Sequence, residues 1–163
     1  MCSTSLRIGT WDEHSQEYYL HLFCPEQPDL NWENEACRKA IYEDALHFWL
    51  RRGVDGFRVD TVNMYSKGEI LDAPITDPNS AHQPAGDLYC NGPRMHEFLR
   101  EINNDVLAKY GDVMTVGELP NTPDMAHVLR YVSSSDPQLS MVFSFDIVDL
   151  GTHSRHPYLH SHM

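Results

Sequence analysis

The strongest constraint on the fold is an alternation of helix-like and short strand-like segments through the middle of the chain. Apolar residues at helical spacing predict helices over residues 35–52 and 93–110. Each predicted helix is followed at once by a short apolar run typical of a strand, residues 54–59 and 113–117. A last run of this kind covers residues 140–148. The alternation is typical of parallel βα units, so we predict an α/β fold.

Local signals mark where the helices begin and end. Asn34 predicts the N-cap of the first helix, and Gly53 predicts its end. Pro93 and Gly111 bracket the second helix in the same way, and a Thr-Pro pair predicts the cap of a short helix over residues 122–131. The first helix is expected to bury an apolar face made of Ala36, Ala40, Ile41, Ala45, Phe48 and Trp49. The second is expected to bury Met95, Phe98, Leu99, Ile102, Val106 and Leu107.

Composition bounds the class of protein. A chain of 163 residues, 41% of them hydrophobic, is long enough for one globular domain with a buried core. Its 24 acidic and 12 basic residues give a net charge of -12, which repels a phosphate backbone and predicts no nucleic-acid partner. No apolar run approaches the ~20 residues of a membrane helix, and no signal peptide is visible. The four cysteines are scattered, which predicts neither a zinc site nor a disulfide framework and favours the cytoplasm.

Two further segments stand out. The last eleven residues hold His153, His156, His160 and His162, four of the ten histidines, and we interpret them as an irregular tail rather than a metal site. Residues 65–92 lack periodicity, and unstructured loops longer than ~12–15 residues are usually functional or disordered.

Two carboxylates follow neighbouring predicted strands. Asp60 comes at the end of residues 56–60 (GFRVD), and Glu118 at the end of residues 116–118 (VGE). Because strand side chains alternate between faces, Arg58 and Asp60 point to one face, whereas Phe57 and Val59 point to the other. Active sites of βα barrels lie at the carboxyl ends of the strands. We therefore expect Asp60 and Glu118 to converge at one rim.

The residue types favour a division of roles. Arg58 stabilises the charged form of Asp60, which suits a nucleophile, whereas a drier position for Glu118 keeps its proton, which suits a general acid. Two carboxyl groups about 5–5.5 Å apart are typical of a retaining glycosidase. Three alternatives remain: solvated surface acids, a purely structural Arg–Asp pair, and metal ligands, although no histidine lies near either acid at ligand spacing.

Three segments in this order resemble consecutive signatures of glycoside hydrolase family 13, the α-amylase family: residues 27–31 (QPDLN), 56–60 and 116–118. The first resembles the oligo-1,6-glucosidase and maltase branch, and the chain from Trp11 to about Gly151 is similar throughout to fungal-type α-glucosidases. The resemblance implies a partial (β/α)8 TIM barrel, roughly strands four to six with their helices, and no cofactor. It divides the chain into an unmatched segment 1–10, a barrel part 11–151 and an unmatched tail 152–163.

The resemblance implies a retaining, maltase-like α-glucosidase that acts on α-glucoside oligosaccharides through a covalent glucosyl-enzyme intermediate. Asp60 matches the nucleophile, Glu118 the acid/base, and Arg58 the arginine that keeps the nucleophile ionised. Thr61 matches a linkage determinant that is valine in α-1,6-preferring enzymes and threonine in α-1,4-preferring ones. The sequence therefore predicts maltose-like substrates, with an α-1,6-preferring or isomerising enzyme as the alternative.

The resemblance also assigns the surrounding segments. Residues 18–23, which are apolar and aromatic, are predicted to form a strand and resemble the closing strand of a small insertion domain. The loop over residues 65–92 is expected to lie over the pocket. Its Asp72, Asp77 and Asp87 are candidates for a sugar subsite, with solvated loop acids as the alternative.

Several parts of the family pattern have no match in this chain. The chain is shorter than the ~200-residue lower end of such barrels, and the family's Asn-His-Asp segment is absent. We therefore expect a truncated product with weak or no turnover of its own. Open sheet edges are expected to favour self-association. The alternative is a non-catalytic remnant that acts only as a binding module.

Overall fold

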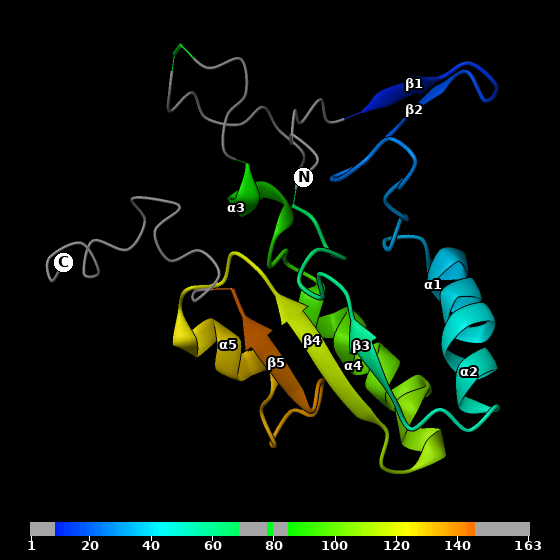
Figure 1. Ribbon diagram of the computed structural model, residues 1–163, viewed down its shortest axis with the longest axis vertical. Coiled ribbons are helices and arrows are strands. Elements are labelled where there is room, and N and C mark those ends of the chain that lie inside the picture. The colour runs from blue at the N-terminus through cyan, green and yellow to red at the C-terminus, as the bar shows by residue number, and fades with distance from the viewer. Residues whose placement is uncertain (1–8, 69–77, 80–84, 146–163) are drawn as a thin grey trace, which may run out of the picture.

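The computed structural model describes residues 9–68, 78–79 and 85–145 (Figure 1). The predictions for the four tail histidines, for Asp72 and Asp77, and for residues 146–148 lie outside the described residues. The boundaries predicted at residues 10 and 151 stay predictions.

A parallel sheet forms the centre of the described chain. Its strands are β3 (Gly56–Val59), β4 (Met114–Leu119) and β5 (Met141–Ser144), in the order β3-β4-β5. Both pairs are parallel, with Arg58 opposite Val116 and Glu118 opposite Phe143. The prediction of parallel βα units is confirmed, because a helix connects each strand to the next.

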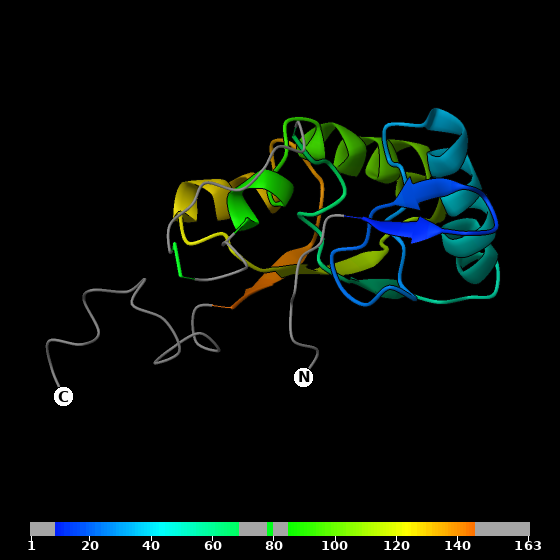
Figure 2. The same ribbon diagram turned by 90° about the horizontal axis from the view of Figure 1, so that it is seen from above.

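Helices cover one face of this sheet. The chain passes from β3 to β4 through α3 (Gly86–Tyr89), α4 (Met95–Asp105) and a 3₁₀ turn, η2 (Leu107–Tyr110), and from β4 to β5 through α5 (Met125–Tyr131). Figure 2 shows α4 and α5 on the same side of the sheet, and no helix among the described residues lies on the other side. The face without helices carries the charged side chains of Arg58 on β3 and Glu118 on β4.

The first predicted helix begins and ends where expected but turns a different face inward. It runs as α1 (Glu35–Ile41), a π-helical segment η1 (Tyr42–His47) and α2 (Phe48–Leu50). Asn34 caps it by accepting the N–H of Ala36 at 2.9 Å, and Gly53 follows it with a φ of +86°. Of the six residues that the prediction buried, Ile41 is half-buried and packs against a core cluster, and the other five, Ala36, Ala40, Ala45, Phe48 and Trp49, are exposed. Arg38, Tyr42 and Leu50 are buried instead, and Tyr42 and Leu50 pack with Val106 and Leu107 beside the end of α4.

The second helix follows the prediction. Met95, Phe98, Leu99, Val106 and Leu107 are all buried, Ile102 packs against them, and Gly111 follows the helix with a φ of +83°. The third helix begins later than predicted, because Asp124 rather than Thr122 caps it by accepting the N–H of Ala126 at 2.8 Å. The Thr122 hydroxyl is buried and donates to the carbonyl of Pro120 at 3.0 Å.

The core lies between the helices and the sheet. One cluster gathers Val62, Met95, Leu99, Leu119 and Tyr131, and a second gathers Tyr42, Leu50, Val106 and Leu107. Gly117 points into the first cluster, where a Cβ would lie 2.9 Å from Val62 and 2.7 Å from Leu139. Only glycine therefore lets β4 approach these side chains.

The predicted strand over residues 18–23 is mostly wrong. Only β2 (Glu17–Tyr19) is a strand, and it pairs with β1 (Thr10–Asp12) in an antiparallel hairpin. The next residues are held by side chains instead of a ladder, because His21 bonds the Thr10 hydroxyl at 2.8 Å and the N–H of Leu22 donates to Asp29 at 2.7 Å.

Candidate active site

One guanidinium joins the two predicted carboxylates. Arg58 points to the uncovered face of β3, where its Nη1 donates to Asp60 Oδ1 and its Nη2 donates to Glu118 Oε2 at 2.6 Å. Phe57 and Val59 pack on the opposite face with the core clusters, as the strand alternation predicts. The structure thus brings Arg58, Asp60 and Glu118 together, although Glu118 lies inside β4 rather than just beyond it.

The two carboxyl groups differ in exposure and in pKa. The side chain of Glu118 is 14% exposed and that of Asp60 is 67% exposed. Interaction with the neighbouring Glu118 carboxyl, together with Arg58, holds the pKa of Asp60 below its usual value against partial burial. The pKa of Glu118 is raised, chiefly because burial disfavours its charge and also because Asp60 lies beside it. A lowered pKa at Asp60 beside a raised pKa at Glu118 is the pattern that a nucleophile and a general acid require.

The turn after Asp60 has an unusual backbone. Thr61 has a φ of +37°, a region that β-branched residues rarely adopt and that costs on the order of 1–3 kcal/mol. Its N–H donates to Glu118 Oε2 at 3.2 Å, and its carbonyl accepts the N–H of Met64 at 3.0 Å. The N–H of Val62 donates to the backbone carbonyl of Glu118 at 2.9 Å. The strained turn thus joins Asp60 to β4, and no residue pattern signals it in the sequence.

A cavity of about 260 Å³ lies beside Asp60 and Thr61. Residues 27–30 of the QPDLN segment line it, together with Phe23, Trp32, Tyr65 and Lys67 among others. Glu118 is not part of this lining, so the cavity meets the pair of carboxyl groups only at Asp60. Such a volume lies just below the about 300–1,000 Å³ typical of ligand pockets and suits one small ligand.

Asp29 holds the QPDLN segment in place. One of its carboxylate oxygens accepts the N–H of Leu22 at 2.7 Å, and the other pairs with Lys67 Nζ at 2.9 Å. Both side chains are largely buried. Lys67 was not predicted as a site residue, because its partner Asp29 is distant in the sequence.

Trp32 and Tyr65 form an aromatic wall of the cavity. Their rings stack with centroids 4.3 Å apart and planes 4° apart. The Tyr65 hydroxyl donates to the backbone carbonyl of Asp60 at 3.2 Å. Burial raises the pKa of Tyr65, so the hydroxyl keeps its proton as a donor at neutral pH.

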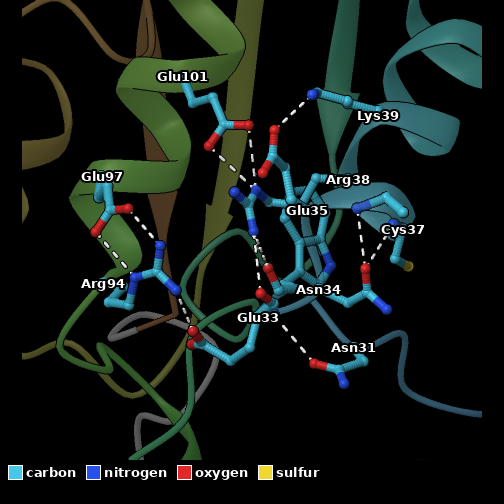
Figure 3. Close-up of polar contacts among 12 residues, drawn as sticks. Asn31, Glu33, Asn34, Glu35, Cys37, Arg38, Lys39, Arg94, Glu97 and Glu101 are labelled. Atoms are coloured by element: carbon cyan, nitrogen blue, oxygen red, sulfur yellow. Dashed lines mark hydrogen bonds and ion pairs between the residues drawn. The ribbon is translucent and has the colours of Figure 1, made fainter.

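A buried ion pair ties this wall to α4. Figure 3 shows Arg38 reaching from α1 to Glu101, where its Nε lies 3.1 Å from both carboxylate oxygens. The Nη1 of Arg38 donates to the carbonyl of Trp32 at 2.7 Å. Arg94 bridges Glu33 and Glu97 beside it (Figure 3). Arg38 therefore fixes the backbone of the cavity wall, a role that sequence spacing did not suggest.

The remaining predictions concern residues away from this centre. Of the three candidate loop acids, Asp87 alone is described; it is exposed on α3 and does not line the cavity. Within the described ranges, no group of three or more His, Cys, Asp or Glu side chains is arranged to hold a metal ion. In the same part of the chain, no helix has the length and apolar character needed to cross a membrane.

The chain is similar in sequence to known glycoside hydrolases over most of its length. The family model described as "Alpha amylase, catalytic domain" matches residues 4–162. An alpha-glucosidase from Candida albicans is 49% identical over 146 residues, which is 89% of this chain and 25% of the relative. An oligo-1,6-glucosidase from Saccharomyces cerevisiae is 50% identical over 147 residues, 88% of this chain and 25% of the relative. The chain thus spans about a quarter of the length of the curated relatives it matches.

Solved structures agree. A variant of the isomaltulose synthase from Erwinia rhapontici, crystallised with its natural substrate sucrose, superimposes with a TM-score of 0.71 at 35% identity. The match covers 88% of this chain and 24% of that one. The three parallel strands thus correspond to part of a larger catalytic domain.

Proposed function

The chain belongs to the alpha-amylase catalytic-domain family of glycoside hydrolases, and from this premise we propose that it carries the catalytic pair of a retaining α-glucosidase. Asp60 is the nucleophile, and Glu118 is the acid/base. Arg58 holds both carboxyl groups and stabilises the charge of Asp60. The observation that supports this most is the pair of opposite pKa directions on two carboxyls that share one guanidinium.

The chemistry follows in two displacements. Asp60 attacks the anomeric carbon while Glu118 gives its proton to the departing glycosidic oxygen, which leaves a glucosyl ester on Asp60. Glu118, now ionised, removes a proton from water, and the resulting attack on the same carbon releases glucose and restores Asp60. The lowered pKa of Asp60 and the raised pKa of Glu118 support Glu118 as the group that begins the cycle protonated.

We assign α-1,4-linked glucosides such as maltose as the substrates. Thr61 lies beside Asp60 in the wall of a cavity with room for one small ligand. The known ligand of the isomaltulose synthase, sucrose, is also a small α-glucoside. An α-1,6 preference is the second candidate, because the oligo-1,6-glucosidase is as similar to this chain as the alpha-glucosidase is.

Exposure of the nucleophile sets the expected rate. Because the Asp60 side chain is 67% exposed, water weakens the electrostatic stabilisation that a closed site provides. We therefore expect very slow turnover of a chromogenic α-glucoside by the 163-residue chain.

Covalent trapping tests the proposal without depending on turnover. An epoxide analogue of α-glucose needs only a nucleophile and an acid, so it should esterify Asp60, and the mass of the peptide that contains Asp60 should increase by one inhibitor. Excess maltose should slow the labelling. Labelling of Asp60→Asn at the wild-type rate, or labelling spread over surface acids such as Glu13 and Asp44, would contradict the assignment.

A further inference from the structure

The peptide group between Asp60 and Thr61 is held at both ends. Its carbonyl, which belongs to Asp60, accepts the hydroxyl of Tyr65 at 3.2 Å. Its N–H, which belongs to Thr61, donates to Glu118 Oε2 at 3.2 Å. A peptide unit is planar and rigid, so one end cannot turn without the other. The Tyr65 hydroxyl and the Glu118 carboxyl are therefore linked through a single amide.

Two observations indicate that this link orients the site rather than only filling space. The φ of +37° at Thr61 fixes how this peptide meets the rest of the turn, and a β-branched residue keeps such a value only where its surroundings impose it. Tyr65 is itself fixed by its stack on Trp32, so its hydroxyl has a defined position. Hydrogen bonds in series also polarise one another, so donation to the carbonyl strengthens the N–H as a donor.

We propose that Tyr65 is a positioning residue that orients the acid/base Glu118 through the Asp60–Thr61 peptide group. The catalytic meaning of this role rests on the proposed function, whereas the link itself does not. Among the residues that the structure describes, the charged or titratable side chains that face Glu118 are Arg58 and Asp60 from the β3 side, and its partner in register on β5 is Phe143. The N–H of Thr61 favours the ionised form of Glu118, so weakening it should favour the protonated form.

The test is a carbon-13 titration of the Glu118 carboxyl in the 163-residue chain and two variants. Tyr65→Phe keeps the ring stacked on Trp32 and removes only the hydroxyl. Tyr19→Phe is the matched control, because the Tyr19 hydroxyl also donates to a backbone carbonyl, that of Pro25 at 2.9 Å, in the exposed hairpin region. We expect the Glu118 midpoint to move upward in Tyr65→Phe and to stay at the wild-type pH in Tyr19→Phe.

A third sample should shift the Glu118 titration midpoint in the opposite direction. Replacing Tyr65 with 3-fluorotyrosine keeps the fold and makes the hydroxyl a stronger donor, so the Glu118 midpoint should move downward. This sample also covers the case in which Tyr65→Phe does not fold. A midpoint that stays at the wild-type pH in every folded Tyr65 sample would overturn the proposal, and so would an equal shift in Tyr19→Phe.

The labelling reaction gives a second readout. Because opening of the epoxide needs a protonated acid, the rate of labelling at Asp60 should fall above the pKa of Glu118. In Tyr65→Phe this decline should move to higher pH, and the maximal rate should fall roughly tenfold through poorer alignment. If Asp60 is never labelled while the Glu118 midpoint still moves in the Tyr65 samples, the positioning role is supported and the proposed function is overturned.

Discussion

The two faces of the sheet differ in what they bury and in what they expose. On the helix side, Phe57, Val59 and Leu119 pack into apolar clusters with α4, α5 and the first helix. On the other side, one or two positions along the same strands, Arg58 and Glu118 join Asp60 in a charged network. The difference teaches that a residue period of two lets one strand serve stability and chemistry at once. Changes on one face should therefore leave the other largely intact.

The sharpest test of the charged face is Asp60→Asn. Losing the proposed nucleophile should lower the rate of covalent labelling by at least about a thousandfold. The melting temperature should change little, because the Asp60 side chain is mostly exposed. Mass spectrometry and a thermal melt measure the two effects. If Asp60→Asn instead melts at a much lower temperature and is still labelled at the wild-type rate, Asp60 serves stability rather than chemistry.

The matching test of the packed face is Leu99→Ala. Leu99 is 2% exposed at the centre of a core cluster, so the cavity left behind should lower the free energy of unfolding by roughly 3 kcal/mol. The control is Met114→Ala on the uncovered face, where the side chain is 49% exposed and the loss should be about 0.5 kcal/mol or less. Urea denaturation gives both values. Equal losses would mean that the uncovered face is packed as well.

Thr61→Val probes the boundary between the faces with a nearly isosteric change. The strained backbone is retained, but the hydroxyl beside Asp60 is replaced by a methyl group. We expect the ratio of protection by isomaltose to protection by maltose to rise by roughly tenfold in the labelling assay. An unchanged ratio would remove Thr61 from the determinants of linkage.

The smallest effect expected is a pH dependence of stability. Because the pKa of Glu118 is raised in the folded protein, Glu118 stabilises the fold fully below the pKa that it has in the unfolded chain. This stabilisation is lost as pH rises through its pKa in the folded protein. Because the pKa of Asp60 is lowered in the folded protein, Asp60 stabilises the fold above its unfolded pKa, and this stabilisation is lost as pH falls through its folded pKa. Urea midpoints of the wild type and Glu118→Gln should therefore converge or cross as pH rises from mildly acidic to neutral values. A constant difference across that interval would contradict the pKa of Glu118.

Local and periodic features could be predicted from the sequence. The parallel βα order, the Asn34 cap and the convergence of Asp60 with Glu118 depend on residue type and on strand period alone. The buried face of the first helix was predicted wrongly, because two overlapping apolar faces compete and the π-helical segment shifts which one turns inward.

Features that depend on distant partners could not be predicted. Arg38 meets Glu101 across 63 positions, and the positive φ of Thr61 depends on the contacts around its turn. Composition and spacing carry no trace of either. The catalytic roles of Asp60 and Glu118 stay predictions, which the labelling experiments test.

The buried Arg38 has a consequence for how the molecule should unfold on heating. It ties the carbonyl of Trp32, at the edge of the cavity beside Asp60, to Glu101 on the helix that covers the sheet. Thermal loosening of α4 should therefore reach the aromatic wall through this side chain. Upon gradual heating, we expect the stacked Trp32 and Tyr65 rings to separate before the parallel sheet unfolds.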